Sequence, residues 1–600
     1  MADSTDSSII KQSQFRLFET VKKVSFELEC ELMLRADSLS WKWQSPPPEG
    51  KDIVAHTEEE VRISWVLRVL AEPDDMGDET SHAENAPTKL VIYFVRRLSE
   101  PDFQYCVDNV TLHGPSSLCE EWVITLTDHL HRTAPQRPKS LLVIINPCSG
   151  GKKAEKMFKN DIAPIFQLAG IKTDVRVTAE ARDSFNILGN IDLSVFDGLV
   201  SVGGDGTHYE VIAALIRKTM KDKGVEELTS STVLQSPSIR HGMIPAGTGN
   251  GGQLFASYSK DPVTNAIVIA LGDSKPRDIL SLHCGDKFLD TCFFACAYGL
   301  MAQALDTMEN YRWTGPLRFV AGCFVGIVKH APVLMTIDYL PGRPSVKKAA
   351  SEPKSSSAKK VNLDSMDESS EPIGVNSQPE RTGENPVKAR QNIEDELAEP
   401  GNVSQREGAG EITKASQDIT DEATDPGDGC QMDGAGEKPT ASQEDDLPPG
   451  WVRLHDKILE VDIFCFPNMD MVDLNRYYLS EHTMEKGAFT LLYSKPCGRI
   501  AHMKFIAKLI EGNLEQAVAE CGFVECINVK ECRVRAVLDK GDRRPMKSIS
   551  CDGETITSLG ACYEVRCHPG LLDVFARTDG GQLRELCNIE KATSLQEKTE

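Results

Sequence analysis

Alternating apolar and polar positions near the start of the chain predict β-strands, and a helical spacing of apolar residues follows them. The helical run, Ser117–Leu130, places Trp122 on its apolar face. Residues 1–135 are therefore expected to form a small, mostly β N-terminal module closed by a helix. The predicted strands of this module are Gln14–Met33, Val61–Val69 and Lys89–Arg96.

From residue 136 to residue 275, short continuous apolar runs alternate with runs at helical spacing. Continuous apolar runs are typical of strands that are buried on both faces. The alternation predicts an α/β domain with a parallel sheet. Its predicted elements are Leu141–Ile145, Lys156–Leu168, Thr173–Thr178, Val195–Val202, His208–Ile216 and Met243–Ile244.

Strand patterns dominate residues 276–340 and 451–580, which predicts a β-rich second lobe after the α/β domain. Residues 581–600 are expected to be a tail. The predicted strands of the lobe are Ile279–His283, Lys287–Ala297, Ala331–Tyr339, Lys457–Phe466, Phe489–Tyr493, Glu531–Val537, Thr555–Thr557 and Glu564–Cys567.

The segment 341–450 interrupts this lobe and has a different composition. It contains no Phe, Tyr or Trp and carries 23 acidic and 12 basic residues. Such a segment cannot bury enough apolar surface to offset its ordering entropy, so it is expected to be a disordered acidic insert. It is either an inert tether or a regulatory segment whose serines are phosphorylated.

The whole chain of 600 residues carries a net charge of −24, which argues against a nucleic-acid binder. No apolar run reaches the roughly 18 residues of a membrane span, and the N-terminus has no signal-peptide pattern. The 18 cysteines include no CxxC pair and the 13 histidines do not cluster, so zinc is not expected. These features predict a cytoplasmic protein with reduced thiols.

The motif Gly-Gly-Asp-Gly-Thr at 203–207 comes directly after a predicted strand and directly before a predicted helix. Glycines in such a turn let the backbone approach phosphate groups closely. Asp205 places a carboxylate in the turn, where it could take a proton from an attacking hydroxyl or hold a magnesium ion. Glu210 is either part of this chemistry or a first-turn carboxylate favoured by the helix dipole.

Two further glycine-containing loops follow strands of the same predicted sheet. Asn146–Lys153 (NPCSGGKK) is either a phosphate loop or an ordinary turn, and it lacks the Walker spacing. Pro245–Gly252 (PAGTGNGG) opens another helix. Because the carboxyl ends of parallel strands share one edge of a sheet, the three loops are expected to meet at one crevice. Asp552–Glu554 (DGE) is a turn that gains meaning only if the second lobe faces that crevice.

These four motifs, in this order, resemble those of the diacylglycerol-kinase-like lipid kinases. The resemblance is closest to the sphingosine (long-chain base) kinases, with the ceramide kinases near, and it covers about residues 135–340 and 451–575. It implies transfer of the γ-phosphate of ATP, with Mg²⁺, to the primary hydroxyl of a lipid. The N-terminal module resembles a pleckstrin-homology domain in outline, with a structural subdomain without a ligand as the alternative.

The resemblance also implies roles for single residues. Asp205 matches the general base of that family. Arg312 and Arg318, in YRWTGPLR, match arginines placed on ATP phosphates, although they could be an ordinary solvated pair. The other positions that match nucleotide-contacting residues are Asn146, Pro147, Cys148, Gly203, Gly204, Gly206, Thr207, Gly247, Thr248, Gly249, Asn250, Asp552, Gly553 and Glu554.

One position departs from the sphingosine kinase pattern. Where those kinases carry acidic residues that recognise the amine of the substrate, this chain has Gln303 and Leu305, and Asp306 comes one residue late. Asp306 is therefore the expected amine partner only if the helix is shifted, and an acceptor without an amine gains ground otherwise. A buried amine without a carboxylate would be costly.

The leading interpretation is a sphingosine kinase that docks reversibly on a membrane surface. The alternatives are a ceramide, diacylglycerol or NAD kinase, or a lipid-binding protein with an inactive kinase fold. The DGE turn and the RWxGxxR stretch favour a lipid over NAD as acceptor. The apolar stretches Phe288–Leu300 and Phe319–Val328 are expected to form either the lipid pocket or ordinary core.

Overall fold

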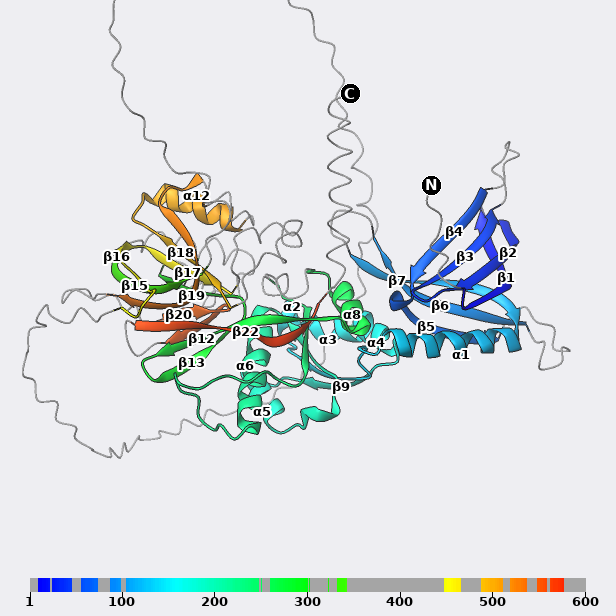
Figure 1. Ribbon diagram of the computed structural model, residues 1–600, viewed down its shortest axis with the longest axis horizontal. Helices are drawn as coiled ribbons and strands as arrows, with labels where there is room; N and C mark the ends of the chain where they lie inside the picture. Colours follow the sequence, from blue (N-terminus) through cyan, green and yellow to red (C-terminus); the bar gives the residue numbers. More distant parts are fainter. Residues whose placement is uncertain are drawn as a thin grey trace, which may run out of the picture. The chain divides into compact units, whose positions relative to one another are not determined.

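The computed structural model gives the conformation of most of the chain outside the acidic insert (Figure 1). Two predicted regions, the tail 581–600 and the part of the insert from 343 to 446, lie outside the described residues. The described residues are 9–21, 24–45, 55–73, 87–98, 104–247, 250, 259–299, 302, 322, 332–342, 447–465, 487–510, 518, 520–536, 548–557 and 562–576.

The N-terminal module is an antiparallel sheet in the order β4-β3-β2-β1-β7-β6-β5, and the helix α1 packs along one face (Figure 1). Trp122 of α1 is fully buried between helix and sheet, as the helical spacing predicted. The elements are β1 (Lys11–Val21), β2 (Val24–Leu34), β3 (Ser38–Ser45), β4 (Ala55–Arg62), β5 (Val66–Pro73), β6 (Pro87–Arg97), β7 (Tyr105–Pro115) and α1 (Ser116–Thr133).

The predicted strand Gln14–Met33 is in fact a hairpin, because β1 and β2 pair with Val21 opposite Val24. The residues between them are Lys22 and Lys23, which are none of the Gly, Pro or Asn residues that signal a turn, so the sequence pattern predicts one uninterrupted strand. The prediction of a single strand over Val61–Val69 is also wrong, since a 3₁₀ turn at Ile63–Trp65 separates β4 from β5.

The α/β domain has the expected parallel sheet, in the order β11-β10-β8-β9. Every residue of β10 is buried, because helices cover both faces: α6 on one side and α4 and α8 on the other. The elements are β8 (Ser140–Ile145), α2 (Ser149–Lys152), α3 (Ala154–Met157), α4 (Ala163–Leu168), β9 (Lys172–Val177), α5 (Asp183–Gly189), β10 (Gly198–Gly203), α6 (Asp205–Asp222), β11 (Arg240–Pro245) and α8 (Pro262–Leu271).

The second lobe consists of antiparallel strands and one described long helix, α12. Two predicted strands are split: Lys287–Ala297 into β13 and β14, and Lys457–Phe466 into β16 and β17. The elements are β12 (Ser274–Cys284), β13 (Lys287–Cys292), β14 (Ala295–Gly299), β15 (Val333–Pro341), β16 (Val452–Ile458), β17 (Glu460–Phe464), β18 (Phe489–Ser494), α12 (Arg499–Ile510), β19 (Val524–Ala536), β20 (Ser548–Cys551), β21 (Glu554–Thr557) and β22 (Cys562–Phe575).

The last strand, β22, connects the lobe to the α/β sheet. Its start pairs with β19, and β12 pairs with it from Glu564 to Phe575. Val574, near its end, also pairs in parallel with His241 of β11. One continuous sheet of 15 strands therefore runs through both regions. The sequence predicted only Glu564–Cys567 as a strand here, and it gave no sign that the end of the chain returns to the first sheet.

No described helix is both long and apolar enough to cross a membrane.

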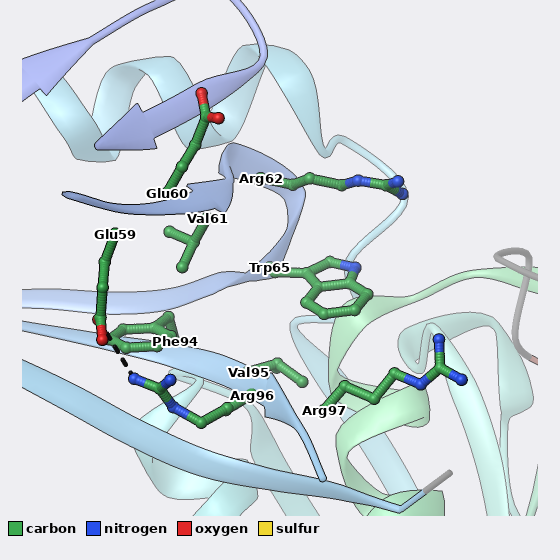
Figure 2. Close-up of a pocket in the computed structure, with 9 residues that line it drawn as sticks. All are labelled: Glu59, Glu60, Val61, Arg62, Trp65, Phe94, Val95, Arg96 and Arg97. Carbon is green, nitrogen blue, oxygen red and sulfur yellow. Dashed lines mark hydrogen bonds and ion pairs between the residues drawn. The ribbon is translucent and has the colours of Figure 1, made fainter. Parts of the chain in front are cut away.

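A hollow of about 310 Å³ lies in the N-terminal module, between β4 and β6 (Figure 2). At one end Arg96 extends towards Glu59 and forms an ion pair with it; at the other end Trp65 lies beside Arg62 and Arg97 (Figure 2). Arg96 also pairs with Asp108. The side chains that line the hollow carry both positive and negative charges, and some of them already form ion pairs within the module. The hollow therefore favours no single class of ligand.

Replacing Gly198 in β10 is expected to destabilise the fold. A Cβ there would lie 2.7 Å from the ring of Phe575 and 2.8 Å from Leu141. Gly198→Ala should lower the free energy of unfolding by about 1–3 kcal/mol, because overpacking a filled core forces side chains out of their preferred rotamers. Denaturant midpoints of the full-length chain measure this. Gly189→Ala, where a Cβ meets nothing within 4 Å, is the control, and equal midpoints for the two variants would contradict the packing described here.

Candidate active site

The three glycine-containing loops meet at one edge of the parallel sheet, as predicted. The backbone N–H of Asn146, after β8, donates to Val202 O of β10 at 3.1 Å. The N–H of Ala246, after β11, donates to Gly203 O at 2.6 Å. The loops after β8 and β11 therefore each begin beside the end of β10, so the loop after β10 lies between them.

Thr207, in the first turn of α6, connects two of the loops. Its hydroxyl accepts a hydrogen bond from the Asn146 amide at 3.0 Å and lies 3.5 Å from the hydroxyl of Ser149. The carbonyl oxygen of the same Asn146 side chain accepts from the N–H of Cys148 at 3.0 Å. Asn146 thus orders its own loop and ties it to the helix, while the side chain of Cys148 stays exposed.

Glycine is required where the loops touch. A Cβ on Gly247 would lie 2.6 Å from the Cα of Gly204, and a Cβ on Gly150 would lie 2.5 Å from Ala246 O. Both distances are shorter than any real contact, so side chains at these positions would force the loops apart. Asn250 adopts a left-handed φ of 54° and exchanges two hydrogen bonds with the backbone of Gly247, at 3.1 and 2.9 Å. Thr248 and Gly249 lie outside the described residues.

Asp205 is the first residue of α6, directly after the extended Gly204, and it is partly exposed. The N-terminus of a long helix carries a partial positive charge, which favours a carboxylate or a phosphate beside it. The site therefore combines the Asp205 carboxylate, two neighbouring glycine loops and a helix N-terminus that favours anions.

The DGE turn reaches this helix from the second lobe. A Cβ placed on Gly206 would lie 2.8 Å from Oε1 of Glu554, so the Glu554 carboxylate lies against the first turn of α6. The two residues are almost 350 positions apart in the sequence. The second lobe therefore faces the crevice, which was the condition for a role of the DGE motif. Glu554 adds a second carboxylate to the first turn of α6, the turn that begins with Asp205.

Asp552, two residues before Glu554, is oriented differently. Its carboxylate is buried and accepts hydrogen bonds from the backbone N–H groups of Phe293, Phe294 and Ala295 at 2.7–2.8 Å. Burial raises its pKa to about 6, although these hydrogen bonds oppose the shift. Asp552 has a left-handed φ of 48° and Gly553 a φ of 90°. The carboxylate holds the turn in place, and its contact with a nucleotide stays a prediction.

Glu210 has a structural contact that the sequence did not reveal. Its carboxylate accepts hydrogen bonds from the N–H groups of Arg182 and Ser184, at 2.9 and 3.1 Å. These groups begin α5, and Arg182 has a left-handed φ of 66°. Glu210 therefore caps a neighbouring helix and fixes the loop that follows β9, beside the other three loops.

A buried polar cluster lies beneath the first turns of α6, and sequence reasoning missed it. The Ser201 hydroxyl lies 2.7 Å from Nδ1 of His208 and 3.0 Å from Nε2 of His241. Burial lowers the pKa of His208 to about 4 and that of His241 to about 3, so both rings are neutral at physiological pH. The cluster joins α6 to β10 and β11 one turn away from Asp205.

Several predicted residues lie outside the described part of the chain. They are Gln303, Leu305, Asp306, Arg312, Arg318 and the stretch 319–328 apart from position 322. Of the other apolar stretch, Phe288, Phe293 and Tyr298 belong to hydrophobic core clusters. The alternative that this stretch forms core is therefore confirmed for these three residues.

Residues 140–282 match the family model described as "Diacylglycerol kinase catalytic domain". This part of the chain is therefore similar to diacylglycerol kinase catalytic domains. The matched region begins at the first residue of β8 and contains all three glycine loops and Asp205. The DGE turn lies outside the matched residues, although its Glu554 contacts the first turn of α6.

Similar proteins include both ceramide and sphingosine kinases. The chain is 30% identical over 317 residues to a ceramide kinase of Homo sapiens, covering 51% of this chain and 57% of that protein. It is 32% identical to ceramide kinase 1 of Caenorhabditis elegans, covering 34% and 38%. It is also 32% identical to sphingosine kinase 1 of Arabidopsis thaliana, covering 32% and 38%. The match spans little more than half of the human protein and less of the other two.

Removing one buried imidazole should make the protein less sensitive to acid. In the folded protein His241 takes up a proton only near pH 3, whereas in the unfolded chain it does so near pH 6.5. Its neutral burial therefore costs stability progressively as pH falls below about 6.5. The free energy of unfolding of wild type, relative to His241→Phe, should fall by about 1 kcal/mol per pH unit between about pH 6 and 4.

Chemical denaturation of both proteins across this pH range measures the effect. The matched control is His131→Phe, which replaces an exposed histidine of α1. A constant difference between wild type and His241→Phe across the range would contradict a neutral, buried His241.

Proposed function

We propose that this chain is an ATP-dependent lipid kinase that phosphorylates the primary hydroxyl of a sphingolipid, with ceramide as the leading acceptor. The observation that carries the proposal is the meeting of Asp205, the three glycine loops and Glu554 at the N-terminus of α6. Such a site suits phosphoryl transfer, which depends mostly on positioning and on neutralising charge.

In this proposal Asp205 takes the proton from the lipid hydroxyl as that oxygen attacks the γ-phosphate. The loops after β8, β10 and β11 bring backbone close to the phosphates, and Asn146 and Thr207 hold two of them together. Carboxylate oxygens are ligands that Mg²⁺ accepts, so Glu554 is the described residue that would hold the ion, while Asp205 acts as the base. Mg²⁺ supplies charge neutralisation at the phosphates. Arg312 and Arg318 would add bidentate contacts.

The choice of ceramide over a sphingoid base follows from charge. Ceramide has no amine, whereas sphingosine carries a cation that needs a buried carboxylate. This chain has Gln303 and Leu305 where the sphingosine kinases that it resembles carry acidic residues. The human and nematode relatives are named ceramide kinases, which supports the same acceptor. A sphingoid base remains the second candidate, because of the Arabidopsis relative and because Asp306 lies close by in sequence.

A membrane-resident acceptor also implies where the protein works. We propose a cytoplasmic protein that associates peripherally with a membrane surface, since a lipid substrate must be reached at the bilayer.

The acceptor is tested by phosphate transfer from labelled ATP with Mg²⁺, offered separately to ceramide, sphingosine, diacylglycerol and NAD. Ceramide is expected to give the highest kcat/KM. Product from sphingosine alone would overturn the choice of acceptor, keep the mechanism and make Asp306 the amine partner to test. No product from any acceptor, with protein that binds ATP, would favour a lipid-binding protein with an inactive fold.

Asp205→Asn is expected to lower turnover by about 10²–10⁴-fold, the usual contribution of a general base. Affinity for ATP should change little, because the amide keeps the size of the side chain and the fold. Steady-state kinetics and nucleotide titration separate the two effects.

Asp222→Asn, at the other end of α6, is the matched control, because Asp222 is exposed and pairs only with Lys218 among the ion pairs described. It should keep wild-type turnover. Full activity in Asp205→Asn would rule out Asp205 as the base, and an equal loss of ATP affinity would make it a binding residue instead.

A further inference from the structure

Two segments far apart in sequence bring three metal-binding side chains together inside the second lobe. Cys292 ends β13, Cys551 ends β20 259 residues later, and Asp552 begins the turn that follows β20. One donor atom from each lies within 4.8 Å of the other two, and all three residues are buried. Among the described residues, this is the one group of three or more metal-binding side chains whose donor atoms lie this close together.

The spacing of the donors fits a tetrahedral site. With typical Zn–S and Zn–O bonds of about 2.3 and 2.0 Å, two ligand atoms of a tetrahedron lie about 3.5 Å apart. Sγ of Cys292 lies 3.4 Å from Oδ1 of Asp552. The Cys292 thiol and the Asp552 carboxylate are therefore close enough to contact one ion, with Oδ2 of the carboxylate as the ligand atom.

A fourth donor, the thiol of Cys296, lies near the group but outside the set whose donor atoms are all within 4.8 Å of one another, so it would have to move closer to become a ligand. Cys296 of β14 pairs across the sheet with Cys551, and its thiol interacts with that of Cys292. Cys296 is also buried. Three thiols and a carboxylate would complete a closed coordination sphere supplied entirely by the protein, which is typical of structural metal sites.

The surroundings already orient the carboxylate. The N–H groups of Phe293, Phe294 and Ala295 hold Asp552 from the side of the β13–β14 connection. Hydrogen bonds of this kind to a ligand carboxylate fix its direction and help to offset the cost of a buried negative charge. Oδ2 accepts only one of the described hydrogen bonds, from Phe293, so it keeps a lone pair for a cation.

We propose that Cys292, Cys551 and Asp552, with Cys296 as the fourth ligand, bind a thiophilic divalent cation, with Zn²⁺ as the leading ion. Thiolates select Zn²⁺ over the hard cations Mg²⁺ and Ca²⁺. Binding displaces the thiol protons, so affinity falls as pH falls. The ion would clamp the start of the DGE turn to the β13–β14 connection, and it takes no part in phosphoryl transfer. The proposal therefore stands or fails independently of the kinase activity.

Sequence analysis did not indicate zinc because such sites are recognised from cysteines and histidines at short, regular spacings. Cys292 and Cys296 are separated by three residues, and the other two ligands come from a distant hairpin. Only the pairing of β14 with β20 brings the two segments together.

Metal content is the first test. The full-length chain, expressed in zinc-supplemented medium, should contain about one zinc per chain by mass spectrometry of the elements. Cys292→Ala and Cys551→Ala should lose it. Cys532→Ala is the matched control, because Cys532 is buried in the same lobe and lies outside the cluster, and it should retain the metal.

A Co²⁺ titration of the wild-type chain stripped of metal needs no variant that must fold. Tetrahedral coordination with thiolate ligands gives intense visible bands and thiolate-to-metal charge transfer in the near ultraviolet. A strong chelator should lower the melting temperature of wild type and of Cys532→Ala. Wild-type protein without stoichiometric metal, a Co²⁺ spectrum without thiolate bands, or metal retained in both Cys292→Ala and Cys551→Ala would each overturn the proposal.

Discussion

The pairing of β22 with β11 is the constraint on which the arrangement of the site depends. This strand leaves the second lobe and ends inside the α/β sheet, where Phe575 is almost fully buried. Its ring occupies space that Gly198 and Gly242 leave free on the neighbouring strands, and the Arg240 guanidinium lies 4.6 Å from its centre. Two glycines and one phenylalanine thus shape the join between the lobe and the α/β domain. Together with the hydrogen bond from Tyr209 of α6 to Asp290 of β13, this join sets the position of Glu554 relative to α6.

Around the site, polar contacts complement the apolar packing. Ser201, His208 and His241 lie between α6 and the sheet, Glu210 caps α5, and Asp552 holds the DGE turn. Each of these contacts is directional, unlike hydrophobic packing. The first two connect elements that carry the loops, and the third connects the DGE turn to the β13–β14 connection. Leaving a buried partner unsatisfied costs about 1–3 kcal/mol, so the contacts favour one arrangement of the loops over close alternatives.

The parts of the site that were predictable from sequence are those with a local signal. A strand, a glycine turn and a helix in succession located the loops at Asn146, Gly203 and Ala246, and the rule that parallel strands share an edge brought them together. The hairpin of β1 and β2 was missed because the two residues between these strands, Lys22 and Lys23, are not of the types that usually signal a turn. The return of β22, the Ser201 cluster and the partners of Glu210 were missed because they depend on residues distant in sequence, whose pairing leaves no periodic pattern. The Cys292 cluster belongs to the same class.

The charge of the chain illustrates the difference between a global and a local property. A net charge of −24 by itself opposes the binding of a polyanionic nucleotide, yet a net charge of −11 lies in the segment 341–450. At physiological ionic strength the field of exposed charges is screened within about 8 Å. A phosphate at the crevice therefore responds mainly to what lies within a turn or two of α6. There the helix N-terminus and close backbone favour the anion, while Asp205 and Glu554 oppose it unless a cation lies between. In the proposed kinase, the acidic residues would make nucleotide binding depend on a divalent cation, as the magnesium complex of ATP supplies.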